Sequence, residues 1–186
     1  VNLWIFDKNT KKFKKEEILF SPGIYKLVDE ILVNARDHAV RNPKKCKNIK
    51  INLDKDTGRI TIWNDGPGIE VKFHKDFKKY VPEMIFGHLR TSSNYEETGK
   101  IVGGKNGFGA KLTNIFSKEF TIETVDSDEK KFFSQTFSNN MRERTEPIIK
   151  SSKESSYTSV SFIPDYPRFG FKNITNELIG LFSKRV

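Results

Sequence analysis

The sequence feature that most constrains the fold is a long amphipathic helix expected near the N-terminus. Ser21 suits an N-cap and Pro22 the first helical position, and Asn42-Pro43 ends the pattern. The apolar residues between them recur at helical spacing: Ile24, Leu27, Val28, Ile31, Leu32 and Ala35. The sequence therefore predicts a helix from residue 22 to about residue 40, whose apolar stripe must be buried against another layer.

The rest of the chain predicts that other layer as a sheet of hairpin strands. Asp56-Thr57-Gly58 is a hairpin signal between two of them. Strands are expected at residues 3–6, 49–53, 59–63, 119–125, 131–137 and 157–163, and further helices at 82–89, about 110–116 and about 173–185. This mixture predicts an α+β fold, a two-layer sandwich with helices on one face of a mostly antiparallel mixed sheet.

Composition narrows the class of protein. The 16 phenylalanines argue against disorder, and no apolar run approaches the ~20 residues of a membrane span. The lone Cys46 has no partner for a disulfide or a zinc site, which favours a reducing, intracellular compartment. The net charge of +9 leaves two interpretations open, attraction to a polyanion such as nucleic acid and an ordinary solvated surface.

The predicted first helix carries a line of polar residues. Glu30, Asn34 and His38 are spaced i, i+4 and i+8, so they lie along one side of the helix. A carboxylate such as Glu30 can remove a proton from water. The carboxamide oxygen of Asn34 can ligate Mg²⁺, which prefers oxygen ligands. The alternative is an ordinary solvated helix face.

A tight turn follows the strand that ends at Trp63. In Asn64-Asp65-Gly66-Pro67-Gly68, two glycines flank a proline, which lets the backbone approach a ligand closely. The carboxylate of Asp65 at the strand end can accept a hydrogen bond from an exocyclic amine such as that of adenine. The alternative is a simple turn with an Asx cap.

Four glycines between Gly103 and Lys111 precede a predicted helix. Bare backbone N–H groups and the positive end of a helix suit phosphates, and Lys111 adds a charge. Ala110-Lys111 replaces the Lys-Ser/Thr of a Walker loop, so that pattern fails. Hydroxyl and amide groups at 91–94 precede the run. The sequence favours a phosphate-binding role over a flexible loop.

In this order the segments resemble the GHKL ATPases, which include gyrase, heat-shock chaperone ATPases, histidine kinases and MutL. Within that group the chain is similar to the ATPase domain of eukaryotic-type topoisomerase II over nearly its whole length. The resembling segments are 27–35, 80–89, 91–95, 103–116, 162–165 and 168–169. The resemblance implies the Bergerat fold of these ATPases.

The resemblance also implies roles for individual residues. Glu30 matches the general base and Asn34 the Mg²⁺ ligand, while Asp65 matches an adenine-reading aspartate and Thr158 the threonine near it. His38 stands where the family usually has a nucleotide-contacting asparagine, and Pro67 where lysine or arginine is more common. The remaining ATP-binding positions expected are Asn64, Gly68, Ser92, Ser93, Asn94, and the lid Gly104, Lys105, Asn106, Gly107, Phe108, Gly109, Ala110 and Lys111.

For the whole chain the resemblance implies one N-terminal ATPase domain over residues 1–186, without the transducer and DNA-cleavage domains. The parent would bind ATP and Mg²⁺, form an ATP-dependent homodimer, and close a gate behind double-stranded DNA, in a nucleus or in the virion or host cell of a large DNA virus. In the family, a lysine from the transducer stabilises the transition state, so this chain is expected to bind nucleotide and to turn it over slowly. An N-terminal arm joins two protomers in the family, and without it the chain is expected to be mainly monomeric.

Two rival functions remain. A histidine-kinase-type phosphotransferase shares the fold, but those kinases generally have asparagine where this chain has Glu30, and a carboxylate there favours hydrolysis. A basic DNA-binding module would give salt-sensitive DNA binding and indifference to ATP. That second rival leaves the combination of Glu30, Asp65 and the glycine run unexplained.

Overall fold

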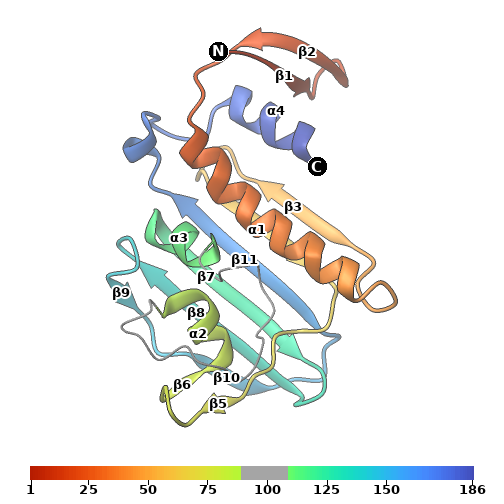
Figure 1. Cartoon of the computed structure of the whole chain (residues 1–186), viewed down its shortest axis with the longest axis vertical. Helices are drawn as coiled ribbons and strands as arrows, with labels where there is room; N and C mark the ends of the chain where they lie inside the picture. The colour runs from red at the N-terminus through yellow and green to blue at the C-terminus, as the bar shows by residue number, and fades with distance from the viewer. Residues whose placement is uncertain (89–108) are drawn as a thin grey trace.

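The computed structural model describes residues 1–88 and 109–186, and it has a sheet covered on one face by helices (Figure 1). The sheet has seven strands in the order β10-β8-β7-β11-β4-β3, with β9 paired to β8, and every pair is antiparallel. Its strands are β3 (Ile49–Leu53), β4 (Ile60–Asn64), β7 (Ser117–Asp126), β8 (Lys131–Ser138), β9 (Glu143–Arg144), β10 (Ile148–Ser151) and β11 (Tyr157–Pro164). The predicted α+β fold is confirmed.

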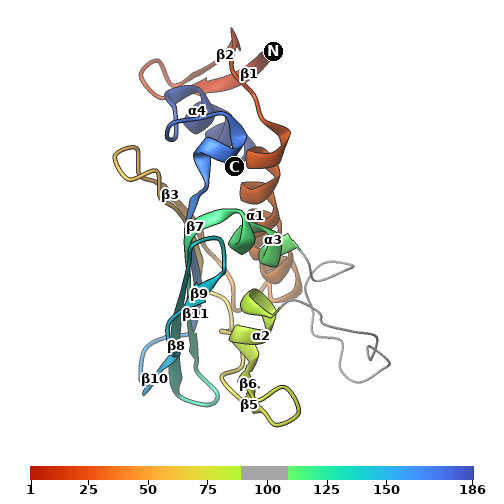
Figure 2. The same ribbon diagram turned by 90° about the vertical axis from the view of Figure 1, so that its left-hand side faces the viewer.

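Helices α1 (Pro22–Arg41), α2 (Val81–Gly87) and α3 (Gly109–Ile115) lie together on one side of the sheet, and α4 (Asn176–Arg185) lies at its end beside the N-terminal segment (Figure 2). A 3₁₀ turn, η1, spans Tyr166–Phe169. The apolar stripe of α1 is buried as predicted, from Ile24 to Ala35. Phe120 on β7 is fully buried, and its ring packs against Phe86 of α2, Phe137 of β8 and Phe162 of β11.

Several boundaries differ from the predicted ones for local reasons. The last helix begins at Asn176 rather than near residue 173, because the Thr175 hydroxyl caps it by accepting a hydrogen bond from Leu178 N at 3.2 Å. The first strand, β1 (Asn2–Asp7), pairs with an unpredicted strand β2 (Lys12–Glu17). β2 lacks an apolar alternation because five of its six residues are exposed. Short strands β5 (Phe73–His74) and β6 (Lys79–Tyr80), as well as β9 and β10, were also not predicted.

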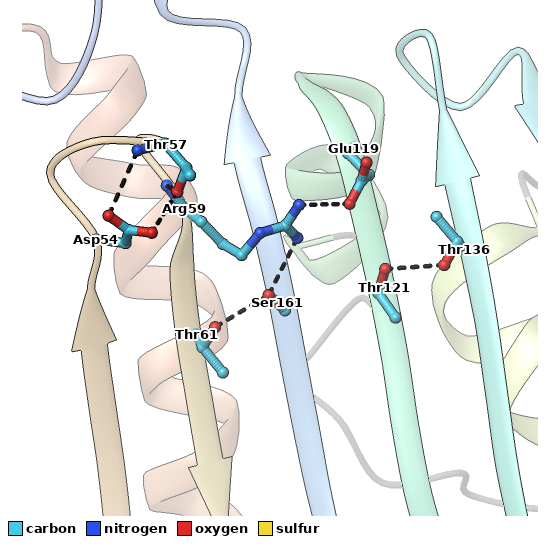
Figure 3. Close-up of polar contacts among 8 residues, drawn as sticks. All are labelled: Asp54, Thr57, Arg59, Thr61, Glu119, Thr121, Thr136 and Ser161. Carbon is cyan, nitrogen blue, oxygen red and sulfur yellow. Dashed lines mark hydrogen bonds and ion pairs between the residues drawn. The ribbon is translucent and has the colours of Figure 1, made fainter.

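The face of the sheet away from the helices carries hydroxyl and charged side chains (Figure 3). Thr61 and Ser161 hydroxyls lie 3.0 Å apart, and the Arg59 guanidinium bonds Ser161 Oγ at 3.3 Å and the Glu119 carboxylate. These contacts join β4, β11 and β7 at one end of the sheet. The pattern explains why these strands alternate between apolar and polar residues.

Replacing Arg59 with methionine is expected to lower the free energy of unfolding by about 0.5–1 kcal/mol, since partly exposed ion pairs contribute little. Urea unfolding of the single variant, of Glu119→Gln and of the double variant measures the coupling between the two residues. A loss several times larger would mean that this surface network is a main support of the sheet.

Candidate functional site

The carboxylate of Glu30 lies against the start of α3. Its Oε1 pairs with Lys26 Nζ at 2.8 Å, one turn earlier on α1. A Cβ placed on Gly109 would collide with the Glu30 carboxyl group, so a larger residue at this point would push the Glu30 side chain aside. Gly109, at the end of the glycine run, therefore lies directly beside Glu30, the proposed general base.

Two buried side chains of α3 fix this arrangement. The Thr113 hydroxyl donates to Leu27 O of α1 at 3.0 Å, and Asn114 Nδ2 donates to Phe86 O of α2 at 3.0 Å. Both side chains are fully buried. Burial and the charges of Lys79 and of Lys111, on the same helix, lower the pKa of His88. Of the predicted lid residues on α3, Gly109 thus lies beside Glu30, Ala110 is buried in the hydrophobic core, and Lys111 lies near His88.

Asn34 lies between Glu30 and His38 on α1 and is partly exposed. Within residues 1–88 and 109–186 its carboxamide forms no hydrogen bond. Glu30 and His38 are eight residues apart, or about 12 Å along the helix axis. The three side chains therefore form one edge of an elongated site. In its middle, the Asn34 carboxamide has no hydrogen-bond partner among the described residues.

Asn64 and Asp65, at the turn after β4, have different hydrogen-bond partners. Asn64 is 5% exposed, and its Oδ1 accepts a hydrogen bond from Gly66 N at 3.2 Å. The Asp65 carboxylate accepts hydrogen bonds from Lys47 N and Asn48 N, both at 2.8 Å, and from Asn48 Nδ2 at 2.7 Å. The carboxylate predicted to read adenine is thus engaged by the segment that leads into β3.

The hydrogen bonds of Asp65 make it a source of pH-dependent stability. Burial alone would raise the pKa of Asp65, but hydrogen bonds from Asn48 and Lys47 outweigh it and lower the pKa to about 2. Because the folded value lies below the ordinary 3.8, the stabilisation is complete above pH 3.8 and is lost as the pH falls through about 2.

The excess stability of the wild type over Asp65→Asn is therefore expected to be constant above pH 5 and to shrink between pH 3.8 and about 2. Denaturant unfolding across this range measures it. Asp76→Asn, at a carboxylate that is 88% exposed, is the control and should show no such window. A wild-type advantage that does not change with pH would contradict the hydrogen bonding of Asp65.

The glycines of this turn have close neighbours. His38 Nε2 lies 2.8 Å from Pro67 O, and a Cβ on Gly66 would be 2.5 Å from His38 Cδ2. A Cβ on Gly68 would collide with Val125 O of β7. The turn is therefore packed between the C-terminal part of α1 and the end of β7.

Thr158 faces the site through sheet register. It pairs with Asn64 of β4 on one side and with Thr124 of β7 on the other. Thr124 is fully buried, and its Oγ1 accepts a hydrogen bond from Ile69 N at 2.9 Å and lies 3.3 Å from Thr158 Oγ1. Sequence reasoning missed Thr124, because nothing local distinguishes it from other strand threonines.

A cavity of about 390 Å³ adjoins the turn. Asp65, Pro67 and Gly68 form one side of it, and another is formed by Asp126 at the end of β7 with Ser127 and Asp128 of the following turn. Lys45, Ser155 and Ser156 complete its lining. Glu30, Asn34 and His38 do not line this cavity, so it is distinct from the edge that α1 forms.

Part of the predicted site lies outside the described residues. Ser92, Ser93, Asn94, Gly104, Lys105, Asn106, Gly107 and Phe108 belong to this part. In residues 1–88 and 109–186 there is no cluster of three or more His, Cys, Asp or Glu residues suited to a metal ion. Nor does the described part of the chain contain a helix long and apolar enough to cross a membrane.

Comparison with protein families gives one match over most of the chain. The family described as "Histidine kinase-, DNA gyrase B-, and HSP90-like ATPase" matches residues 21–166. These bounds contain the site, from Glu30 to Thr158.

Individual relatives are similar over the full chain. The DNA topoisomerase 2 of Acanthamoeba polyphaga mimivirus is 50% identical over 190 residues, and that of Penicillium chrysogenum is 44% identical over 186 residues. Each alignment covers 100% of this chain, which spans only 15% and 12% of those relatives. The crystal structure of the ATPase region of Saccharomyces cerevisiae topoisomerase II superposes with a TM-score of 0.89 at 44% identity, covering 100% of this chain and 50% of that one.

Proposed function

The chain belongs to the histidine kinase-, DNA gyrase B- and HSP90-like ATPase family, and from this premise we propose that it is the N-terminal ATP-binding and ATP-hydrolysing domain of a DNA topoisomerase 2. The observation that carries the hydrolytic role is the contact between Glu30 and Gly109. It sets a carboxylate beside the end of the glycine run proposed to hold the phosphates.

Glu30 would orient the attacking water and take its proton. Phosphoryl transfer to water depends mainly on positioning and on charge neutralisation, so one well-placed carboxylate suffices as base. The ion pair with Lys26 at 2.8 Å restrains the Glu30 carboxylate next to α3. A kinase of the same family needs no such base, and Glu30 therefore favours hydrolysis over transfer to a protein histidine.

Asn34 fits a Mg²⁺ ion that arrives with the nucleotide. Mg²⁺ takes few protein ligands and several from phosphates and water, and the Asn34 carboxamide forms no hydrogen bond with the residues that the structure describes. When bound, the ion would neutralise charge on the phosphates.

We assign adenine recognition to Asn64, with Thr158 beside it, rather than to Asp65. Asn64 is buried and pairs with Thr158 across the sheet, whereas the Asp65 carboxylate is engaged by Lys47 and Asn48. A carboxamide can both donate and accept, which matches the amine and ring nitrogens of adenine. Asp65 would then hold the turn in place.

Ser92, Ser93 and Asn94 would contact ribose and phosphates, and residues 104–111 would close over the phosphates as a lid. For the parent protein we propose ATP-dependent homodimerisation and action on double-stranded DNA, as in relatives named DNA topoisomerase 2. Residues 1–186 would be one domain of that protein. Those relatives come from a virus and a eukaryote, so the protein would act in a nucleus, or in the virion or host cell of a large DNA virus.

Calorimetric titration with a non-hydrolysable ATP analogue, with and without Mg²⁺, tests the proposal. The wild type should bind more tightly with Mg²⁺, and Asn34→Ala should remove most of that gain while keeping metal-independent binding. Asn52→Ala is the matched control, because Asn52 is exposed on β3. Binding that ignores both the nucleotide and the metal would refute the proposed function.

A further inference from the structure

The contact between His38 and the turn of Gly66, Pro67 and Gly68 links α1 to the adenine-binding end of the proposed site. His38 Nε2 lies 2.8 Å from Pro67 O, and its ring lies beside Gly66. The carbonyl is an acceptor only, so Nε2 carries the proton in this contact. The backbone of His38 is itself held, since Asn42 Nδ2 donates to His38 O at 3.0 Å.

We infer that His38 is a positioning residue, which holds the Gly66–Pro67–Gly68 turn in its nucleotide-binding conformation and does not itself bind the nucleotide. This inference rests on the proposed function, because it concerns the same site. The donor that a nucleotide would use, Nε2–H, is committed to Pro67 O. His38 therefore affects adenine binding through the turn that it holds, without contacting the nucleotide.

Among the described residues, the other contacts of the turn hold Gly66, Gly68 and Ile69, whereas the contact with His38 holds Pro67. Gly66 N is held by Asn64 Oδ1, Ile69 N by Thr124 Oγ1, and Gly68 packs against the backbone of Val125. Proline has no N–H, so the carbonyl is its only backbone polar group. Without His38 the middle of the turn would keep its fixed φ but lose its tie to α1.

His38 and Gly66 also form a steric pair. A Cβ on Gly66 would be 2.5 Å from His38 Cδ2 and 2.6 Å from Nε2, and 3.0 Å from Asn64 Oδ1. The φ of Gly66 is not positive, so the backbone itself would accept alanine. The His38 ring is therefore the main obstacle to a side chain at residue 66, whereas at residue 68 the obstacle is the Val125 backbone.

The binding test uses a non-hydrolysable ATP analogue and ADP. His38→Ala should weaken both by the same factor, about fivefold, the worth of one hydrogen bond, and His38→Gln should restore most of the loss by supplying an N–H donor. Gly66→Ala should weaken both nucleotides by more than His38→Ala does, and adding His38→Ala to it should bring binding back to the level of the His38→Ala single variant. Adding His38→Ala to Gly68→Ala should recover nothing. Loss confined to the ATP analogue, or no recovery in the Gly66→Ala, His38→Ala double variant, would overturn the inference.

A second measurement needs no nucleotide. In the unliganded protein, ¹⁵N NMR of the His38 ring should show the Nε2–H tautomer, and His38→Ala should speed hydrogen exchange at the Gly66 and Gly68 amides but not at Gly109. An Nδ1–H tautomer, or unchanged exchange, would refute the positioning role. A wild type that binds neither nucleotide would instead refute the proposed function, and this measurement would still decide the role of His38.

Discussion

Replacing Glu30 with glutamine is expected to leave nucleotide binding within about twofold and to slow ATP hydrolysis by about 100-fold or more. Glutamine keeps the size of the side chain and its place beside Gly109, but it cannot accept a proton from water. Single-turnover release of labelled γ-phosphate, with the protein in excess over ATP, measures the rate even where wild-type turnover is slow. Titration with a non-hydrolysable analogue measures binding separately.

Asp29→Asn is the matched control, since it makes the same chemical change at the adjacent residue of α1. Asp29 pairs with Arg185 of α4 at 2.8 Å and reaches Lys26, the partner of Glu30, only at 4.0 Å. Its hydrolysis rate should equal that of the wild type. If Glu30→Gln hydrolysed ATP at the wild-type rate, another group would have to be the base, and the contact of Glu30 with Gly109 would be structural.

Replacing Asn64 with alanine is expected to weaken binding of an ATP analogue by about tenfold to a hundredfold. The change removes the carboxamide proposed to bond adenine and leaves Gly66 N without its acceptor, and each lost buried hydrogen bond costs about 1–3 kcal/mol. Calorimetric titration measures the affinity. GTP should bind the wild type weakly, because its base presents a different pattern of donors and acceptors.

Asp65→Asn separates the two neighbouring residues. The amide can still accept from Lys47 N and Asn48 N, so it should lower stability more than nucleotide affinity. Asn64→Asp should retain part of the binding, because a carboxylate still accepts hydrogen bonds from Gly66 N and the adenine amine. A large loss of affinity in Asp65→Asn, with none in Asn64→Ala, would return adenine recognition to Asp65, as the sequence first predicted.

The elements that sequence predicts well are those whose pattern is local and strong. The stripe from Ile24 to Ala35 defines α1 without tertiary knowledge, and its bounds agree with the structure within a residue at the C-terminal end. The sequence predicts β1 but not its partner β2, because β2 is mostly exposed and charged. Its pairing depends on Ile5 packing with Ile18 and Leu181, a contact made at the other end of the chain.

The sequence predicts which residue types form the candidate site better than it predicts the directions in which their side chains point. Spacing alone places Glu30, Asn34 and His38 on one line of α1, but it cannot show that the carboxylate of Asp65 turns towards Asn48. Thr124 could not be found from the sequence, because its role depends on sheet register with Thr158. Side-chain direction and register are set by packing of distant segments.

Backbone amide NMR of the chain during titration with a non-hydrolysable ATP analogue and Mg²⁺ locates the nucleotide on the structure. We expect saturable shifts at Asn34, Asn64, Gly66, Thr158 and Gly109, and much smaller ones at Thr61, Thr121 and Ser161 on the opposite face of the sheet. No saturable shifts, or shifts confined to that opposite face, would contradict a nucleotide site between α1, the turn and α3.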